Sequence, residues 1–136
     1  EASHVQAENA LDYVFGYTIA NDVSDRHLQQ KDGQFTRAKS FATFKPLGPV
    51  IRTGINPNNL SIQLTQNGKV KQASNTSDFV FTVEEIIQEV TKVMTLFPGD
   101  IILTGTPSGV DAMKPGDIID IEIEGIGKLT NQVAEK

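Results

Sequence analysis

The stretch from Leu60 to Lys71 constrains the fold most, because it has the pattern of two antiparallel strands joined by a tight turn. Apolar residues stand at every second position from Leu60 to Leu64, as in a strand that buries one face. Asn67 and Gly68 then favour a type I′ turn, in which both central residues have positive φ. The sequence therefore predicts a β-hairpin here.

A single substantial helix is predicted over residues 82–95. Its apolar residues recur three and four positions apart, which is the spacing of one helix face. The Thr82 hydroxyl can cap the first turn while Glu85 reaches back to the backbone, the arrangement called a capping box. Pro98 and Gly99 follow and end the helix. We expect this helix to serve packing rather than chemistry.

The other elements predict a mainly β domain of the α+β class. They are a short helix over residues 7–13 and strands over 14–21, from about 50, after 100, after 117 and over 128–133. Two of these strands follow similar phrases, 98–102 and 115–119, each predicting a turn and then a strand. Two copies of so short a phrase do not make a repeat protein.

Length, charge and composition exclude several classes of protein. The 136 residues fit one domain, 1–136. A net charge of −5 with scattered basic residues lacks the positive patch of a nucleic-acid-binding protein. The absence of Cys excludes disulfides, thiol catalysis and zinc–thiolate sites. No apolar run approaches the roughly 20 residues that span a bilayer, so we expect no membrane partner and a cytoplasmic location.

Asp22 is the first candidate for a functional residue, because it directly follows an apolar, strand-forming run. A carboxylate at the end of a buried strand is costly unless a cation pairs with it. That cation could be a divalent ion, since Asp oxygens suit Mg²⁺, Mn²⁺ or Ca²⁺. It could also be a nearby basic side chain, Arg26, Arg37 or Lys39, with Gln29 in the same polar segment. From the pattern alone, a pair with Arg26 or a cap on the following turn is the commoner outcome.

A second candidate is the segment 103–110, which is rich in hydroxyls and glycine and contains Gly105 and Thr106. Backbone N–H groups of such loops can approach an anion such as a carboxylate or an enolate. The alternative is an ordinary β-turn that uses Gly109. The segment lacks the Gly-Lys-Ser/Thr ending of a P-loop. His27 could act as a base, although its polar surroundings favour a surface position.

Several phrases of the chain, in order, resemble those of the fumarylacetoacetate hydrolase family. Any one of them is a weak signal, but together they are specific and cover nearly the whole chain. They are residues 16–24 (GYTIANDVS), Arg26 with 28–29, residues 37–41 (RAKSF), 46–49 (PLGP), 74–78 (SNTSD), 98–107 (PGDIILTGTP), 114–117 (KPGD) and 122–127 (EIEGIG).

The resemblance implies the mixed β-roll fold of the family's C-terminal catalytic region, usually in a homodimer. It implies a divalent-metal site, with Mg²⁺ first and Mn²⁺ or Ca²⁺ as options, and a small oxo-acid substrate. Members hydrolyse C–C bonds in acylpyruvates and fumarylacetoacetate, or decarboxylate or isomerise related 2-oxo acids. We expect a hydrolase of a 1,3-dicarbonyl acid such as an acylpyruvate. The alternatives are a decarboxylase or isomerase, or an inactive structural portion that needs an upstream segment or a partner chain.

The resemblance also assigns roles by position. Asp22 resembles the metal ligand, and Lys39 resembles the active-site lysine that balances substrate charge. Arg26 and Gln29 match positions that line the substrate pocket. A metal that two substrate oxygens chelate stabilises an enolate, and a neighbouring lysine adds positive charge to the same site.

The loop residues and two departures complete this expectation. Gly105 and Thr106 match the loop that holds a substrate oxygen or carboxylate. The family often has Asp directly after the arginine, where this chain has His27, so the local charge differs. The family's other metal ligands, two glutamates, and its catalytic His-Glu lid lie upstream of the matched region. The chain begins Glu-Ala-Ser-His without Met, and we expect that the domain lacks its N-terminal part.

Overall fold

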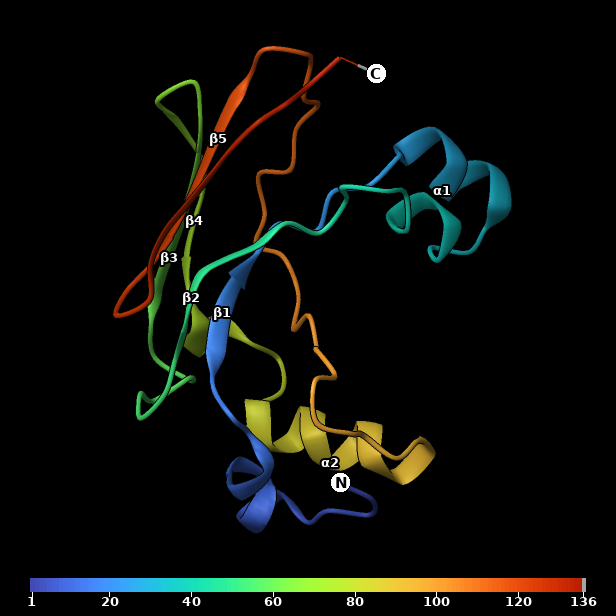
Figure 1. Ribbon diagram of the computed structural model, residues 1–136, viewed down its shortest axis with the longest axis vertical. Helices are drawn as coiled ribbons and strands as arrows, with labels where there is room; N and C mark the ends of the chain where they lie inside the picture. Colours follow the sequence, from blue (N-terminus) through green and yellow to red (C-terminus); the bar gives the residue numbers. More distant parts are fainter. Residues whose placement is uncertain (136) are drawn as a thin grey trace.

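The computed structural model describes residues 1–135 as two antiparallel sheets with helices beyond them. The strands are β1 Tyr17–Ala20, β2 Leu47–Arg52, β3 Ser61–Gln66, β4 Lys69–Asn75, β5 Ile118–Ile123 and β6 Gly127–Gln132. The helices are α1 Arg26–Asp32 and α2 Val83–Val93, with 3₁₀ turns η1 Ala7–Tyr13, η2 Arg37–Lys39 and η3 Thr76–Asp78. Figure 1 shows α2 and the N-terminal segment packed together beyond the strands, and α1 in a lobe that projects to one side. This architecture confirms the predicted α+β class.

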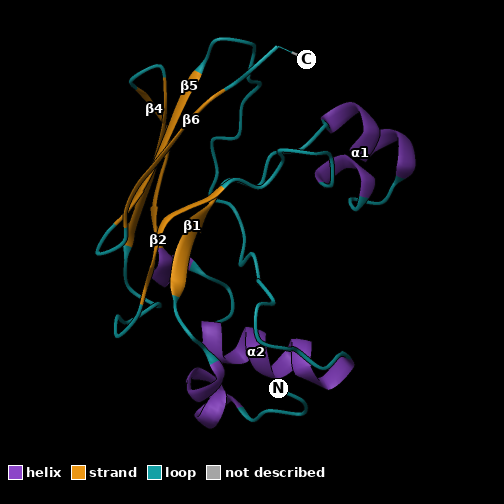
Figure 2. Cartoon of the chain, in the orientation of Figure 1, coloured by secondary structure: helices purple, strands orange, loops and turns teal. Residues whose placement is uncertain are grey.

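The four-stranded sheet has the order β4-β3-β5-β6, and its first pair is the predicted hairpin. Asn67 and Gly68 have φ of 52° and 76°, as a type I′ turn requires. Gln66 pairs with Lys69 across this turn. The second sheet contains only β1 and β2 (Figure 2).

Two apolar clusters form the core. The first joins the two sheets, because Ile19 of β1 is fully buried against residues of β5 and β6. The second fixes α2 to the N-terminal segment. The buried members of the first cluster are Ile19, Ile119, Ile121, Ile126 and Leu129, and those of the second are Ala2, Val5, Ala10, Val83 and Ile87.

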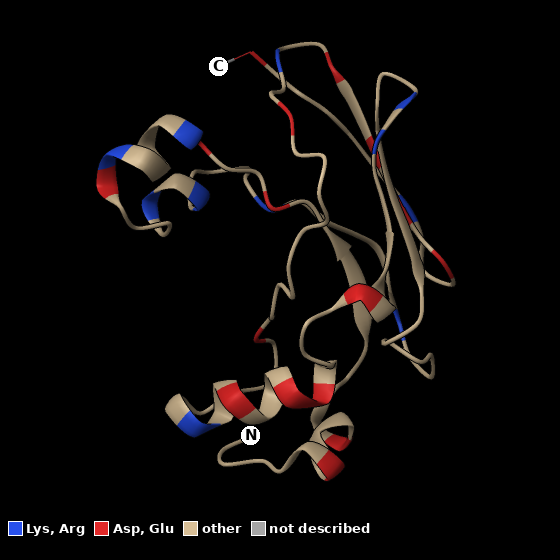
Figure 3. Ribbon diagram, turned by 180° about the vertical axis from the view of Figure 1, so that it is seen from behind, with Lys and Arg blue, Asp and Glu red and all other residues tan. Residues whose placement is uncertain are grey.

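Helix α2 begins with the predicted capping box. The Thr82 hydroxyl oxygen accepts from the backbone N–H of Glu85 at 3.3 Å, and the Glu85 carboxylate accepts from the N–H of Thr82 at 2.8 Å. Figure 3 shows acidic residues along α2 and a basic one near its C-terminal end, the arrangement that the helix dipole favours. No helix within residues 1–135 is long and apolar enough to cross a membrane.

Two of the predicted strands differ from the structure. The strand expected after residue 100 is wrong: the turn forms, with Asp100 accepting from the N–H of Phe97 at 2.8 Å, but residues 101–103 pair with no strand of the described residues 1–135. The strand expected from about 50 begins earlier, at Leu47, and includes Pro49. A proline is tolerated there because β2 is an edge strand, where a missing N–H leaves no ladder position empty.

Candidate active site

Asp22 lies just beyond the end of β1, where the backbone leaves the sheet. The Asn21 N–H still donates to the carbonyl of Pro46 at 3.1 Å, and this contact ends the β1–β2 pairing. The Ser24 hydroxyl then donates to the backbone carbonyl of Asp22 at 3.1 Å. The carboxylate of Asp22 is 19% exposed, so it lies in a partly buried place at the base of the α1 lobe.

The two carboxylate oxygens of Asp22 have different surroundings. Lys39 Nζ donates to Asp22 Oδ2 in an ion pair between groups 17 residues apart. Asp22 Oδ1 is buried and has no hydrogen-bond partner among the described residues. Buried carboxylate oxygens are nearly always paired, because an unpaired one loses its hydration without compensation. Asp22 Oδ1 is therefore the atom of this chain that most needs a ligand.

The structure of residues 1–135 contains neither of the two contacts that the pattern favoured for Asp22, a pair with Arg26 or a cap on the following turn. Arg26 Nη1 donates to Gln29 Oε1 at 2.7 Å, so these two side chains pair with each other on the exposed side of α1. Asp25, not Asp22, caps α1: its Oδ1 accepts from the N–H of Leu28 at 3.0 Å. Of the three basic candidates, Lys39 is the partner of Asp22.

Lys39 ends η2 and is held there by a contact that the sequence did not suggest. Lys45 Nζ donates to the backbone carbonyl of Lys39. Thr43 and Lys45 both have left-handed backbones, with φ of 69° and 58°. Such conformations are costly for a β-branched residue and gather at functional sites. No local pattern identifies a lysine six residues after Lys39 as its anchor.

The lobe that carries Lys39 has its own ion pair. Arg37 donates to both carboxylate oxygens of Asp32, at 2.7 and 2.5 Å. This hydrogen bonding lowers the pKa of Asp32 and raises that of Arg37. Arg37, the third basic candidate, is thereby engaged at the far end of α1 and is not available to Asp22. His27 is exposed on the same helix.

Gly105 and Thr106 lie on the long connection from α2 to β5, residues 94–117. Both are exposed. Gly105 has φ of 129°, which an L side chain rarely adopts, although a Cβ there would meet nothing within 4 Å. Within residues 1–135 no hydrogen bond or ion pair joins Gly105 or Thr106 to Asp22. In that described part of the chain, the Arg26–Gln29 pair is likewise bonded neither to Asp22 nor to the loop.

The metal hypothesis can be tested on Asp22 itself. Residues 1–135 hold no group of three or more His, Cys, Asp or Glu side chains arranged to bind an ion. The buried, unpartnered Oδ1 nonetheless fits a cation, because Mg²⁺ takes hard oxygen ligands and often uses only one or two carboxylates with water and substrate. The donor set of this chain is thus compatible with one ligand of a divalent site.

Comparisons with known proteins agree on one family. Residues 1–134 match the model of the fumarylacetoacetate (FAA) hydrolase C-terminal family. The chain is 43% identical over 141 residues to oxaloacetate tautomerase YisK of Bacillus subtilis, covering 96% of this chain and 47% of that protein. It thus spans about half the length of such curated relatives.

Solved structures give the same result. A 5-carboxymethyl-2-hydroxymuconate delta-isomerase from Mycobacterium smegmatis superposes with a TM-score of 0.97 at 47% identity, over 99% of this chain and 54% of that one. A fumarylacetoacetate hydrolase from Exiguobacterium antarcticum superposes with a TM-score of 0.96 at 42% identity, over 99% of this chain and 52% of that one. The chain belongs to the fumarylacetoacetate hydrolase family, and it corresponds to the C-terminal region of that family.

Proposed function

We propose that this protein is an isomerase or tautomerase of a small 2-oxo acid and works through an enolate that positive charge beside Asp22 stabilises. The half-paired carboxylate of Asp22 carries the proposal, because it offers a cation site beside the ammonium group of Lys39. The relatives support this reaction class over our expectation of a C–C hydrolase, since their names include a tautomerase and an isomerase of oxo-acid compounds.

Asp22 Oδ1 is the residue atom that would hold a divalent ion, Mg²⁺ or Mn²⁺ by preference, with Ca²⁺ as a further option. Such an ion supplies Lewis acidity, which lowers the energy of an enolate oxygen relative to the ketone. Because one carboxylate does not complete an octahedral site, we propose that the other ligands come from substrate, water and a further segment or a second copy of the chain. A homodimer remains our prediction for the assembly.

Lys39 has two tasks in this proposal. Its ammonium pairs with Asp22 Oδ2, which leaves Oδ1 as the oxygen that would hold a divalent ion. It also keeps a positive charge near the place where negative charge develops on substrate, and a positive charge in a partly buried site stabilises an enolate more strongly than it would in water. The contact from Lys45 to the carbonyl of Lys39 holds the backbone from which this side chain extends.

The other predicted residues would bind the rest of the substrate. The backbone N–H groups at Gly105 and Thr106 are candidates to donate to a substrate carboxylate or oxygen. Arg26 would bind a second carboxylate through the guanidinium N–H groups that it does not use on Gln29. The keto–enol conversion then moves one proton between the enol oxygen and the carbon next to the carbonyl carbon, while the double bond shifts between C=C and C=O, and no bond to water is formed.

A hydrolytic function is the second candidate, because the structurally similar E. antarcticum protein is named a fumarylacetoacetate hydrolase. Both reactions pass through an enolate, and they differ in whether water attacks the adjacent carbonyl carbon. The two functions can be separated with one preparation and two substrates.

The experiment is a paired assay on the intact protein. The enol form of oxaloacetate is added with Mg²⁺ or Mn²⁺, and its ultraviolet absorbance is followed as it converts to the ketone. An acylpyruvate is offered in parallel, and its cleavage to pyruvate is measured. We expect metal-dependent acceleration of the first reaction. Cleavage without tautomerisation would favour the hydrolase, and no metal-dependent turnover of either compound would overturn both proposals.

A further inference from the structure

The long α2–β5 connection raises the question of what holds Gly105 and Thr106 in place. Residues 101–110 make no hydrogen bond to any described part of the chain. Ile102 packs on the cluster around α2, and Met113 packs on the cluster between the sheets. These two apolar contacts fix the ends of the segment but are non-directional. A loop of this length without secondary structure is uncommon unless it is functional.

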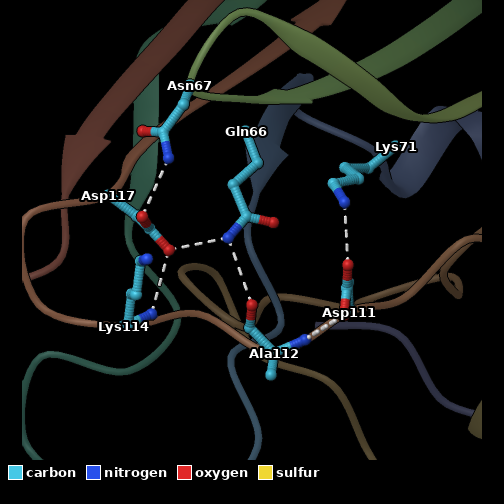
Figure 4. Close-up of polar contacts among 7 residues, drawn as sticks. All are labelled: Gln66, Asn67, Lys71, Asp111, Ala112, Lys114 and Asp117. Atoms are coloured by element: carbon cyan, nitrogen blue, oxygen red, sulfur yellow. Dashed lines mark hydrogen bonds and ion pairs between the residues drawn. The ribbon is translucent and has the colours of Figure 1, made fainter.

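At its two ends the connection is hydrogen-bonded to other parts of the chain, Leu96 to Ala2 and Gly116 to Val133. Between these ends, the directional contacts at residues 111 and 112 come from the β3–β4 hairpin (Figure 4). Gln66 Nε2 donates both to the Ala112 carbonyl at 3.1 Å and to Asp117 Oδ2 at 2.7 Å. Lys71 Nζ pairs with Asp111 Oδ2 at 2.8 Å. One side-chain amide therefore bridges two residues of the connection, Ala112 and Asp117, the second of which directly precedes β5.

Backbone contact brings the connection against the same strand. A Cβ added to Gly109 would lie only 1.9 Å from the carbonyl oxygen of Lys71. The main chain at Gly109 thus passes directly over β4, at a distance that no side chain would permit. Lys71 therefore meets the connection at two points: its carbonyl oxygen lies close to the main chain at Gly109, and its ammonium pairs with Asp111.

Asp117 holds the side chain of Gln66 in position through a set of hydrogen bonds. Its side chain is 3% exposed, and its two oxygens accept from Gln66, from Asn67 Nδ2 at 2.8 Å and from the Lys114 N–H at 2.9 Å. The hydrogen bond from the Lys114 backbone, followed by those of Asn67 and Gln66, lowers the pKa of Asp117. The carboxylate stays charged at neutral pH and keeps all three donors in place.

We propose that Gln66 and Lys71 form a hairpin clamp that sets the position of residues 104–110, and hence of the Gly105 and Thr106 backbone donors. Gln66 and Lys71 are positioning residues in this proposal, because they act on substrate only through the connection. The part that concerns substrate rests on the proposed function, whereas the part that concerns the connection does not. The β3–β4 hairpin would then serve binding as well as the sheet.

The test compares two glutamines of one strand in the intact protein. Gln66→Ala removes the bridging amide, and Gln63→Ala removes the same side chain from an exposed position of β3, where it makes no side-chain hydrogen bond among the described residues. We expect amide hydrogen exchange of peptides covering 111–117, which contain the hydrogen-bonded amides of Ala112, Lys114, Gly116 and Asp117, to become about tenfold faster in Gln66→Ala alone, since two hydrogen bonds are lost. The KM for the oxo acid should rise by a similar factor with kcat little changed.

A second pair of variants, in which the charges of Lys71 and Asp111 are swapped, tests the proposal independently in case Gln66→Ala fails to fold. Lys71→Glu places like charges together at an exposed pair, and Lys71→Glu with Asp111→Lys restores opposite charges. We expect faster exchange in the single variant and recovery of both exchange and KM in the double variant. Lys69→Glu makes the same change of charge at the turn, where Lys69 has no ion-pair partner within residues 1–135, and should leave both values unchanged.

The two readouts separate the two proposals. Exchange over 111–117 that is equal in Gln66→Ala and Gln63→Ala, or in Lys71→Glu and Lys69→Glu, would overturn the clamp. Faster exchange with an unchanged KM would overturn its role in substrate binding. A wild-type protein that turns over no oxo acid would reject the proposed function alone, because the exchange comparison still decides whether the hairpin holds the connection.

Discussion

Asp22 and Asp117 are two poorly exposed carboxylates with opposite hydrogen-bonding states. Asp117 accepts from three donors that surround both of its oxygens. Asp22 has one oxygen paired with Lys39 and the other buried without a partner. A carboxylate that is fully paired stabilises the fold, whereas one that is half paired is poised to bind something else. This difference is the reason that we place Asp22, and not Asp117, in the proposed reaction site.

The strongest way to break this comparison is to remove each carboxylate in turn. We expect Asp22→Ala to lower metal-dependent turnover by about 1,000-fold, which corresponds to about 4 kcal/mol, with the fold intact. Asp117→Ala should instead lower the unfolding temperature clearly, because it leaves three donors unpaired. Turnover and thermal melts of both variants provide the measurement. Full activity of Asp22→Ala would remove that residue from the mechanism.

A second prediction concerns the paired oxygen of Asp22. Lys39→Ala removes the only cation of the described chain that contacts this carboxylate, so we expect kcat to fall by about 100-fold, as when one charge-stabilising donor is lost. Lys31→Ala, at an exposed position of α1 without an ion pair in residues 1–135, is the matched control. If both variants lost activity equally, the effect would come from net charge rather than from the pair.

A third prediction weakens the Asp117 side of the comparison. Asn67 donates to Asp117 Oδ1 at 2.8 Å, accepts from the Ile118 N–H at 2.9 Å, and adopts the left-handed turn conformation. Asn67→Ala loses both hydrogen bonds and strains the turn, so we expect destabilisation of about 2 kcal/mol in urea unfolding. Asn59→Ala, at an exposed loop position, should change stability little. An equal effect of the two would show that Asn67 serves only as a generic loop residue.

The smallest expected effect is a pH dependence. The pKa of Asp117 is lower in the folded protein than the usual carboxyl value of 3.8, because the Lys114 N–H and two side-chain amides favour the charged form. Its contribution to stability is therefore present above about pH 4 and is lost as the pH falls through the folded pKa. In urea titrations, the free energy of unfolding should fall more between about pH 6 and about pH 3 in the wild type than in Asp117→Asn. Parallel loss in the two proteins would contradict this.

Local patterns predicted the elements whose causes are local. The β3–β4 turn at Asn67 and Gly68 and the capping box of α2 each depend on residues only a few positions apart. The two similar turn phrases show where this fails. The phrase at 115–119 leads into β5 because β3 lies beside it, whereas the phrase at 98–102 has no partner strand in the part of the chain that the structure describes. Strand formation there depends on tertiary neighbours that a short phrase does not encode.

The candidate site was predicted only in part, because its contacts also depend on tertiary neighbours. The sequence identified Asp22 as a carboxylate in need of a cation and offered Arg26, Arg37 and Lys39. Spacing along the chain favoured Arg26, but the chain reverses through α1 and η2 and returns Lys39 to Asp22. The anchor that Lys45 provides had no signal in the sequence at all, because it depends on two left-handed residues in the loop after Lys39.

The glycines of the α2–β5 connection have unequal freedom to change. Gly109 has no room for any side chain, since the Lys71 carbonyl occupies that space, whereas Gly105 is surrounded by open space and is limited only by its φ. Substitutions of residues near Gly105 can therefore accumulate without disturbing the close contact between Gly109 and the Lys71 carbonyl. A protein built in this way can acquire new substrate preferences at little cost to folding, which is one physical route by which a single fold comes to host several reactions.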